Sequence, residues 1–160
     1  MVEKKKRIAV IRVRGKVHVR KEIADTLKKL KLTKPNHCVI VDSRDSYMGM
    51  IKKVKDYVTY GEISQKTMEK LIRERGLLEG NKKITEDYIK KNKKFKSIEE
   101  FVKAFMEFKA ELKDINLKGV FRLEPPKKGY ERKGIKLPFS KGGALGYRSD
   151  KINSLIERML

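Results

Sequence analysis

The segment KGGALGYRSDK, residues 141–151, combines glycines with cations, a combination suited to binding phosphate groups. Three glycines lie within five residues between Lys141 and Arg148, ahead of a predicted helix start at Ser149 or the next residue. Glycines allow a backbone to approach a phosphate closely, and a helix N-terminus adds the positive end of a dipole. The ligand could be a nucleotide cofactor or a polynucleotide, or the segment could bind nothing.

The spacing of the glycines disfavours a nucleotide cofactor. A P-loop requires G-x-x-x-x-G-K-[ST] after a strand, and a dinucleotide fold requires G-x-G-x-x-G in a βαβ unit. This segment reads G-G-x-x-G, carries Arg148 in place of a Walker lysine, and precedes one helix with no parallel strand after it. We therefore expect no nucleotide cofactor.

A polynucleotide fits the same segment better. Lys141 and Arg148 would supply positive charge, and Tyr147 could stack on an unpaired base. The alternative is that Gly143 and Gly146 only form turns, while Tyr147 packs on the last helix. We favour contact with RNA, because the surrounding basic loop has few apolar residues to anchor it to the fold.

The side chains that titrate near neutral pH are His18, His37 and Cys38, and they do not form a catalytic set. His37 and Cys38 are adjacent in a predicted strand, so they point to opposite faces. One cysteine excludes an internal disulfide and leaves too few soft ligands for zinc. The carboxylates alternate with lysines, as on a solvated helix face. We expect an inert, buried Cys38 and no catalytic residue, cofactor, metal or small-molecule substrate.

The net charge calls for a polyanionic partner. The 160 residues include 42 Lys and Arg against 21 Asp and Glu, which gives a formal charge of +21. Nucleic acid is the first candidate, because each neutralised phosphate releases condensed counterions. No apolar stretch of about 18 residues, secretory signal or lipidation motif is evident, so we expect a cytoplasmic protein and no membrane contact. The abundance of Lys and Glu is also typical of hyperthermophiles.

The positive charge is concentrated in two regions. Residues 1–60 carry 17 cations and 6 anions, whereas residues 61–118 are nearly balanced, with 15 and 11. Residues 119–148 carry five Lys and three Arg against two Glu. The basic surface is therefore predicted to belong to the first 60 residues and to the late loop.

The periodicity of apolar residues predicts a βαβαβ unit over residues 1–60. Alternation predicts strands, and the i, i+4, i+7 spacing predicts helices with one apolar stripe. The predicted elements in chain order are strand 8–14, helix 21–32, strand 37–42, helix 47–54 and strand 57–60, the last closed by Gly61.

Residues 61–160 are predicted to form an extension packed on this unit, so that the chain is one domain with an addition. Ser64, Thr85 and Ser97 are placed to cap three helices, and Ser97 with Glu100 forms a capping box. A stripe of Phe101, Phe105, Phe108 and Leu112 follows the third cap. A short strand at 120–123, a long irregular loop to residue 148, and a final helix complete the prediction.

Two stretches resemble a known family. NHCVIVDSRDSYMGMIKKVKDYV, residues 36–58, and TLKKLKL, residues 26–32, are similar to the large-subunit ribosomal protein thirty family, whose eukaryotic member is called large-subunit protein seven. The residues that carry this resemblance are Thr26, Leu27, Leu30, Asn36, Gly49, Met50, Ile51, Lys53 and Val54.

Later segments resemble the archaeal and eukaryotic extension of the same family. These are GEIS at 61–64, FRLEPPKKGY at 121–130 and KGGALGYR at 141–148. The absence of a long lysine-rich tail before the first strand favours the archaeal form. The resemblance therefore covers nearly the whole chain.

The resemblance implies an α+β fold and a structural role in the ribosome. The expected core is a three-stranded sheet of βαβαβ order with both helices on one face, ferredoxin-like in outline. The expected function is to bind and stabilise large-subunit ribosomal RNA, with the five-S RNA and neighbouring ribosomal proteins as candidate partners. The alternatives are a non-ribosomal RNA-binding or ribosome-assembly factor and, from another class, an RNA-modifying enzyme.

Three groups of residues are predicted to contact RNA. The first group follows the first strand: Arg12, Arg14, Lys16 and Arg20. The second follows Gly49 on the second helix: Lys52, Lys53 and Lys55. The third lies on the late loop: Lys127, Lys128, Arg132, Lys133, Lys136, Lys141, Gly142, Gly143, Tyr147 and Arg148. Glycine costs a helix about 1 kcal/mol relative to alanine, so Gly49 indicates a close approach, either of RNA or of the sheet.

Overall fold

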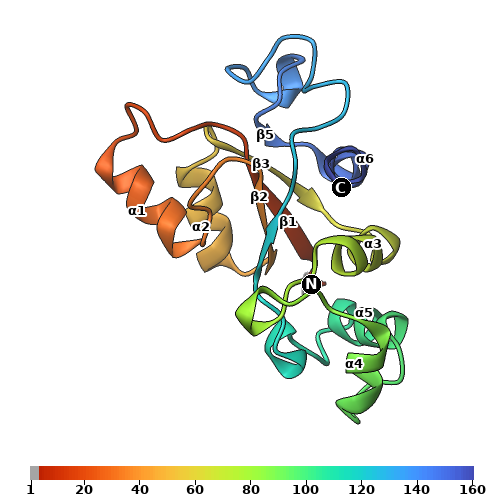
Figure 1. The fold of residues 1–160 in the computed structure, drawn as a ribbon. Coiled ribbons are helices and arrows are strands. Elements are labelled where there is room, and N and C mark those ends of the chain that lie inside the picture. Colours follow the sequence, from red (N-terminus) through yellow and green to blue (C-terminus); the bar gives the residue numbers. More distant parts are fainter. Residues whose placement is uncertain (1–3) are drawn as a thin grey trace.

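A five-stranded sheet of order β4-β2-β1-β3-β5 runs through the computed structural model, which describes residues 4–160 (Figure 1). The strands are β1 (Arg7–Arg12), β2 (His37–Asp42), β3 (Val58–Glu62), β4 (Val120–Arg122) and β5 (Gly146–Tyr147). The α-helices are α1 (Lys21–Lys29), α2 (Asp45–Lys53), α3 (Gln65–Arg75), α4 (Glu86–Lys91), α5 (Ile98–Met106) and α6 (Ile152–Met159). The 3-10 turns are η1 (Glu79–Asn81), η2 (Leu112–Ile115), η3 (Phe139–Lys141) and η4 (Ser149–Lys151).

Strand β1 forms the centre of the sheet. It pairs antiparallel with β2 on one side and with β3 on the other, and all six of its residues are buried. The predicted βαβαβ unit is confirmed between Arg7 and Glu62. The extension widens the sheet, because β4 adds antiparallel to β2 and β5 adds parallel to β3.

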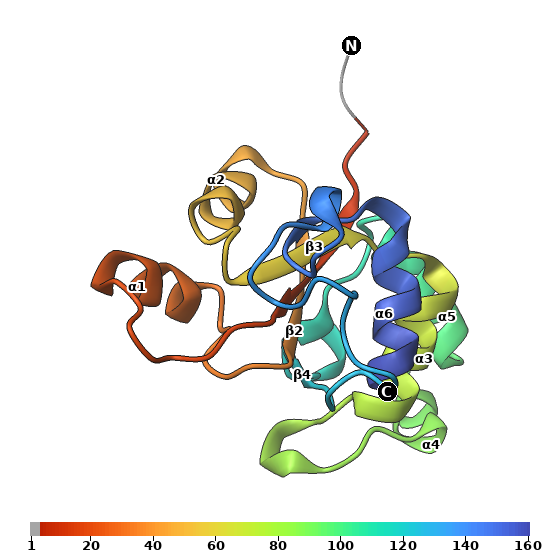
Figure 2. The same ribbon diagram turned by 90° about the horizontal axis from the view of Figure 1, so that it is seen from above.

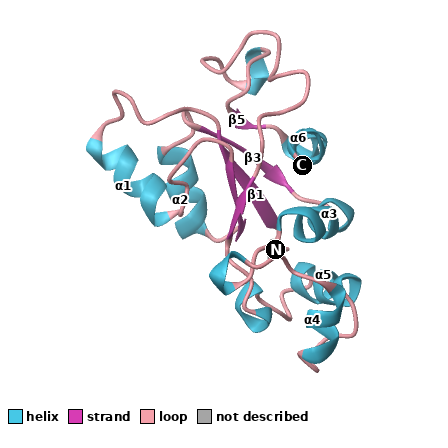
Figure 3. Cartoon of the chain, in the orientation of Figure 1, coloured by secondary structure: helices cyan, strands magenta, loops and turns pink. Residues whose placement is uncertain are grey.

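Helices cover both faces of the sheet, with a separate apolar core on each (Figures 1 and 3). The core around Val10, Leu27 and Ile51 lies on the face that α1 and α2 cover, so both helices share one face, as expected. The core around Phe101 and Ile152 belongs to the face covered by α3, α5 and α6. Viewed from above, the two sets of helices stand on opposite sides (Figure 2). The division of the chain at residue 60 stays a prediction.

The three predicted serine and threonine caps are present. The backbone N–H groups three residues after Ser64, Thr85 and Ser97 donate to the cap hydroxyls over 3.2–3.3 Å. The capping box is only half formed, because the Glu100 carboxylate accepts from the N–H of Lys96. These caps satisfy N–H groups that a helix start would otherwise leave unpaired.

The predicted aromatic stripe divides between two elements. Helix α5 ends at Met106, because Phe108 adopts a left-handed conformation with φ 61°. Leu112 then begins η2, and it is buried in the same core as Phe101. The prediction of core packing is correct for Phe101, Phe105 and Leu112, whereas Phe108 is half-buried outside this core and the predicted helix is too long.

Gly61 does not end the third strand, as predicted, but lies inside β3 opposite Ala9. A Cβ at this position would overlap the carbonyl oxygen of Ser149. Ser149 has φ 55° and opens η4, so neither it nor Asp150 caps α6 with its side chain. Glycine is required here because the backbone before α6 crosses directly over β3.

Arg148 fastens the late loop to the sheet. Its guanidinium donates to Glu131 over 2.6 and 3.2 Å, to Thr59 Oγ1 over 2.7 Å and to the Ala144 carbonyl over 2.8 Å. Its side chain is 1% exposed and lies over the ring of Phe139. The loop predicted to be irregular is therefore closed by a buried ion pair.

Replacing Gly61 by alanine is expected to destabilise the protein by about 1–3 kcal/mol, because overpacking forces the backbone apart. Gly49→Ala provides the matched control: Gly49 is exposed in α2, and an added Cβ there would have no atom of residues 4–160 within 4 Å. That variant should be more stable by about 0.5–1 kcal/mol. Urea unfolding measures both changes, and equal stability of the two variants would contradict the close approach at Gly61.

Replacing Arg148 by alanine is expected to cost about 3–5 kcal/mol of unfolding free energy, because it removes the link between Glu131, Thr59 and the Ala144 carbonyl and leaves Glu131 only Arg158, 3.9 Å away. Arg148→Lys should also destabilise, since one ammonium group cannot reach all the acceptors of the guanidinium. Lys141→Ala, an exposed change on the same loop, should remain within about 0.5 kcal/mol of the original protein. Denaturant midpoints compare the three variants, and a wild-type midpoint for Arg148→Ala would exclude the anchoring role.

Candidate nucleic-acid interface

Most of the predicted contact residues are exposed cations. None of these exposed cations forms an ion pair within residues 4–160. They are Lys16, Arg20, Lys52, Lys53, Lys55, Lys127, Lys128, Arg132, Lys133, Lys136 and Lys141. Arg14 is half-buried, with its guanidinium 5.2 Å from the centre of the Tyr57 ring.

Arg12, which is predicted to contact RNA, has a structural role in the fold. It is 4% exposed, and its guanidinium donates to the carbonyl oxygens of Arg14, Leu32 and Gly15 over 2.9, 2.7 and 3.2 Å. Burial lowers the pKa of Arg12, although the group stays charged at neutral pH. Its donors satisfy the carbonyls that follow β1 and α1, so they are not directed at a ligand.

Two residues of the glycine segment also serve the fold. Arg148 is buried in the ion pair with Glu131 described above, which removes it from the exposed surface. Gly143 is buried, and a Cβ there would overlap the Leu137 carbonyl, so the close approach of protein backbone accounts for this glycine. Gly142 is exposed with φ 90° and ends η3, a conformation that favours glycine.

Tyr147 presents an exposed aromatic ring at the edge of the sheet. It lies in β5 beside Tyr60 of β3, with ring centroids 5.5 Å apart at a tilt of 44°. Its hydroxyl donates to Glu62 Oε1 over 2.6 Å, and the residue is 51% exposed. The partners of Tyr147 thus lie on β3, and one face of its ring remains open to solvent.

The structure brings Tyr147 together with Lys52 around a hollow of about 670 Å³. We call it the tyrosine hollow; the residues that give it its chemistry are Lys4, Lys6, Ser43, Lys52, Tyr60 and Tyr147. Asp45 and Glu62 also line it. The Glu62 carboxylate accepts a hydrogen bond from the Tyr147 hydroxyl and is thus already partnered. Aromatic faces next to free ammonium groups can hold an unpaired base and its phosphates.

Sequence reasoning misses several members of the tyrosine hollow. Lys4 and Lys6 belong to the run KKKR before β1, and this clustered charge is a signal that could have found them. Tyr60 is predicted only as a strand residue. Conversely, the loop cations and the group after β1 do not line this hollow. The predicted contact residues therefore occupy more than one patch.

The chemistry of the remaining candidates is limited. Burial raises the pKa of the Cys38 thiol to about 12, so it is not a thiolate at neutral pH. Among the residues from Lys4 onward, no cluster of three metal-ligating side chains occurs. None of the helices in this part of the chain is long and apolar enough to cross a membrane.

Comparisons with known proteins agree with the resemblance seen in the sequence. A model of the family described as Ribosomal protein L30p/L7e matches residues 8–58. The chain is 52% identical over 149 residues to the large ribosomal subunit protein uL30 of Methanopyrus kandleri, covering 92% of this chain and 100% of that protein. It is 53% identical to the uL30 protein of Methanococcus maripaludis and 51% to that of Nanoarchaeum equitans, each over 152 residues.

The matches to the Methanococcus maripaludis and Nanoarchaeum equitans proteins each cover 95% of this chain, and they cover 98% and 97% of those relatives. The similarity therefore includes the extension after residue 60 as well as the βαβαβ unit, and the relatives are archaeal, as the resemblance indicated. The chain belongs to the Ribosomal protein L30p/L7e family.

Proposed function

We propose that the chain is a structural, non-enzymatic component of the large ribosomal subunit that binds and stabilises ribosomal RNA in the cytoplasm. The observation that supports this most directly is the 52% identity to a uL30 protein over nearly the whole chain, and the tyrosine hollow, where Tyr60 and Tyr147 stand beside lysines, supports the RNA contact. The uL30 relatives are named as large-subunit proteins, and the net charge of +21 suits a polyanion.

The tyrosine hollow would bind RNA through two kinds of contact. The lysines would neutralise phosphates and release counterions, which gives affinity without sequence preference. The exposed face of Tyr147 would stack on a base. Its hydrogen bond to Glu62 raises the pKa of Tyr147, so the phenol remains neutral while its orientation is fixed.

Helix α2 continues this surface. Gly49 is exposed, and within residues 4–160 no atom lies near enough to require glycine, so the alternative of a crowded contact with the sheet is wrong. The helix nevertheless carries the cost of about 1 kcal/mol that glycine imposes. Close approach of an RNA backbone next to Lys52 and Lys53 would account for a residue that the free protein does not need.

The exposed cations of residues 127–141 form a further part of the proposed contact. They extend from a loop that the Arg148–Glu131 ion pair fastens to the fold, so RNA binding would not have to attach the whole segment. The five-S RNA and neighbouring subunit proteins are additional candidates for this loop. A ribosome-assembly factor is the second proposal, and an RNA-modifying enzyme is disfavoured by membership of the family.

Sedimentation tests the proposal at the level of the particle. We expect the protein to co-sediment with mature large subunits at one copy per particle and to be released by high salt, because phosphate contacts weaken with ionic strength. Substoichiometric association confined to precursor particles would instead identify an assembly factor. Recovery in the post-ribosomal supernatant at low salt would overturn the ribosomal role.

Substitutions in the tyrosine hollow test the contact itself. Tyr147→Ala should weaken binding to purified large-subunit RNA by about 1–3 kcal/mol, because stacking is lost, while Tyr147→Phe keeps the ring and most of the affinity. Lys52→Ala should reduce the slope of log affinity against log salt concentration by about 1, because one phosphate contact is lost. Lys90→Ala on α4, an equally exposed lysine elsewhere, is the control. Filter binding across a salt series measures all four, and wild-type behaviour of Tyr147→Ala and Lys52→Ala would exclude this site.

A further inference from the structure

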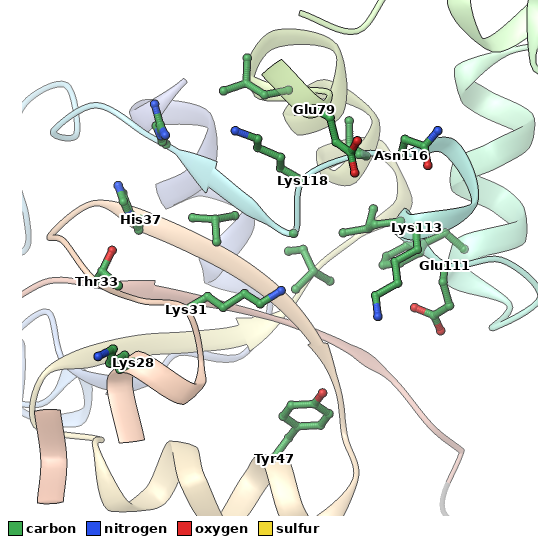
Figure 4. A pocket seen from close by; sticks show the side chains of 18 residues that line it. Lys28, Lys31, Thr33, His37, Tyr47, Glu79, Glu111, Lys113, Asn116 and Lys118 are labelled. Carbon is green, nitrogen blue, oxygen red and sulfur yellow. The ribbon is translucent and has the colours of Figure 1, made fainter. Parts of the chain in front are cut away.

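A second hollow lies at the opposite edge of the sheet, beside β4 (Figure 4). Its volume is about 990 Å³, and its walls come from the end of α1, β2, β4, the start of α2 and the segments around η1 and η2. We call it the β4-edge hollow. None of the residues predicted from the sequence to contact RNA lines it.

Free ammonium groups surround the β4-edge hollow. Lys28, Lys31 and Lys113 line it, and their ammonium groups form no ion pair or hydrogen bond with the described residues. Lys31 extends into the space from one wall, while Lys113 stands on another (Figure 4). Of the two carboxylates nearby, Glu111 accepts from Arg7 over 3.2 Å. The hollow therefore has an excess of unpaired positive charge.

The inner surface of the same hollow is partly apolar. Ile40, Leu117 and Val120 line it together with the ring of Tyr47. Gly119 also lines it and contributes no side chain. An apolar floor beneath a charged rim, in a volume near the upper end of about 300–1,000 Å³, is typical of a site for a flat organic group.

One polar atom at the wall lacks a partner. His37 Nδ1 is buried and has no hydrogen-bond partner in the described residues. Burial, together with the nearby charge of Arg122, lowers the pKa of His37, so the imidazole is neutral at neutral pH. Buried polar atoms are paired in most proteins, but an occupant of the hollow cannot reach a buried nitrogen, so the ammonium groups and the apolar floor carry the case for a ligand.

We propose that the β4-edge hollow binds an unpaired nucleotide of the large-subunit RNA. The base would lie on the apolar floor, and the flanking phosphates would contact Lys28, Lys31 and Lys113. This inference rests on the proposed function, since it takes the RNA of the ribosome as the ligand. RNA is favoured over an acidic protein segment because a base and its phosphates match both the flat apolar floor and the charged rim.

The position of the hollow gives the protein a second function. The sheet order β4-β2-β1-β3-β5 places β4, which borders one hollow, and β5, which borders the other, at opposite edges of the sheet. Two nucleic-acid sites on one rigid sheet would hold two RNA segments at a fixed separation. The protein would thus act as a cross-link within the folded RNA.

Two variants test the β4-edge hollow in different ways. Gly119→Phe places a ring in the hollow without changing charge; a Cβ there meets only the flexible Lys31 Nζ, 3.9 Å away. The double variant Lys31→Ala with Lys113→Ala removes charge and leaves the space open. Lys90→Ala with Lys91→Ala, two exposed and unpaired lysines of α4, is the matched control.

Binding to purified large-subunit RNA is measured across a salt series, with circular dichroism to check that each variant is folded. Gly119→Phe should weaken binding about fivefold or more at an unchanged salt slope, as loss of one stacked base would. The double variant should lower the slope of log affinity against log salt concentration by about 1.5. The control should change affinity and slope only by the small amount that a loss of two distant positive charges causes. If Gly119→Phe does not fold, the double variant still decides the question.

The possible failures are distinguishable. Absence of RNA binding by the original protein would overturn the proposed function. Wild-type binding by both β4-edge variants, while Tyr147→Ala is weakened, would overturn the β4-edge site alone. Normal RNA binding by Gly119→Phe together with poor incorporation into subunits would identify a protein segment as the occupant and would overturn the nucleotide assignment.

Discussion

The buried ion pair between Arg148 and Glu131 positions the candidate site. Desolvating a guanidinium is costly, and here the cost is offset by hydrogen bonds to Glu131, Thr59 and the Ala144 carbonyl. These acceptors lie on three separate segments, so one side chain fixes the loop to β3. The adjacent Tyr147 is thereby held beside Tyr60, and the backbone is directed over Gly61 into α6.

The two kinds of cation have different roles in this protein. Arg7, Arg12 and Arg148 are buried, and within residues 4–160 no lysine is. Arg7 lies between the rings of Phe105 and Phe108, with its guanidinium carbon 3.9 and 4.2 Å from their centres. A planar, weakly hydrated guanidinium suits such sites, whereas an ammonium group keeps its water. Composition therefore predicts a polyanionic partner, but the surface offered to it consists mainly of lysines.

Local patterns predict the parts of the fold that depend on near neighbours. The apolar alternation of β1 and the caps at Ser64, Thr85 and Ser97 are visible because each involves residues within a few positions. The role of Gly61 is not visible, since the carbonyl of Ser149 is remote in sequence, and that of Gly143 is not, since an irregular turn brings the Leu137 carbonyl of the same loop against it. Both hollows escape prediction for the same reason, because chain segments far apart in the sequence form their walls.

Two glycines differ in whether packing within the protein explains them. Gly61 is buried beneath the Ser149 carbonyl, so packing alone explains it. Gly49 is exposed on α2, where the free protein would be more stable with alanine. A residue that costs stability and satisfies no internal contact indicates a partner outside the chain. Since Lys52 of the same helix lines the tyrosine hollow, the proposed RNA contact would include α2 as well as that hollow.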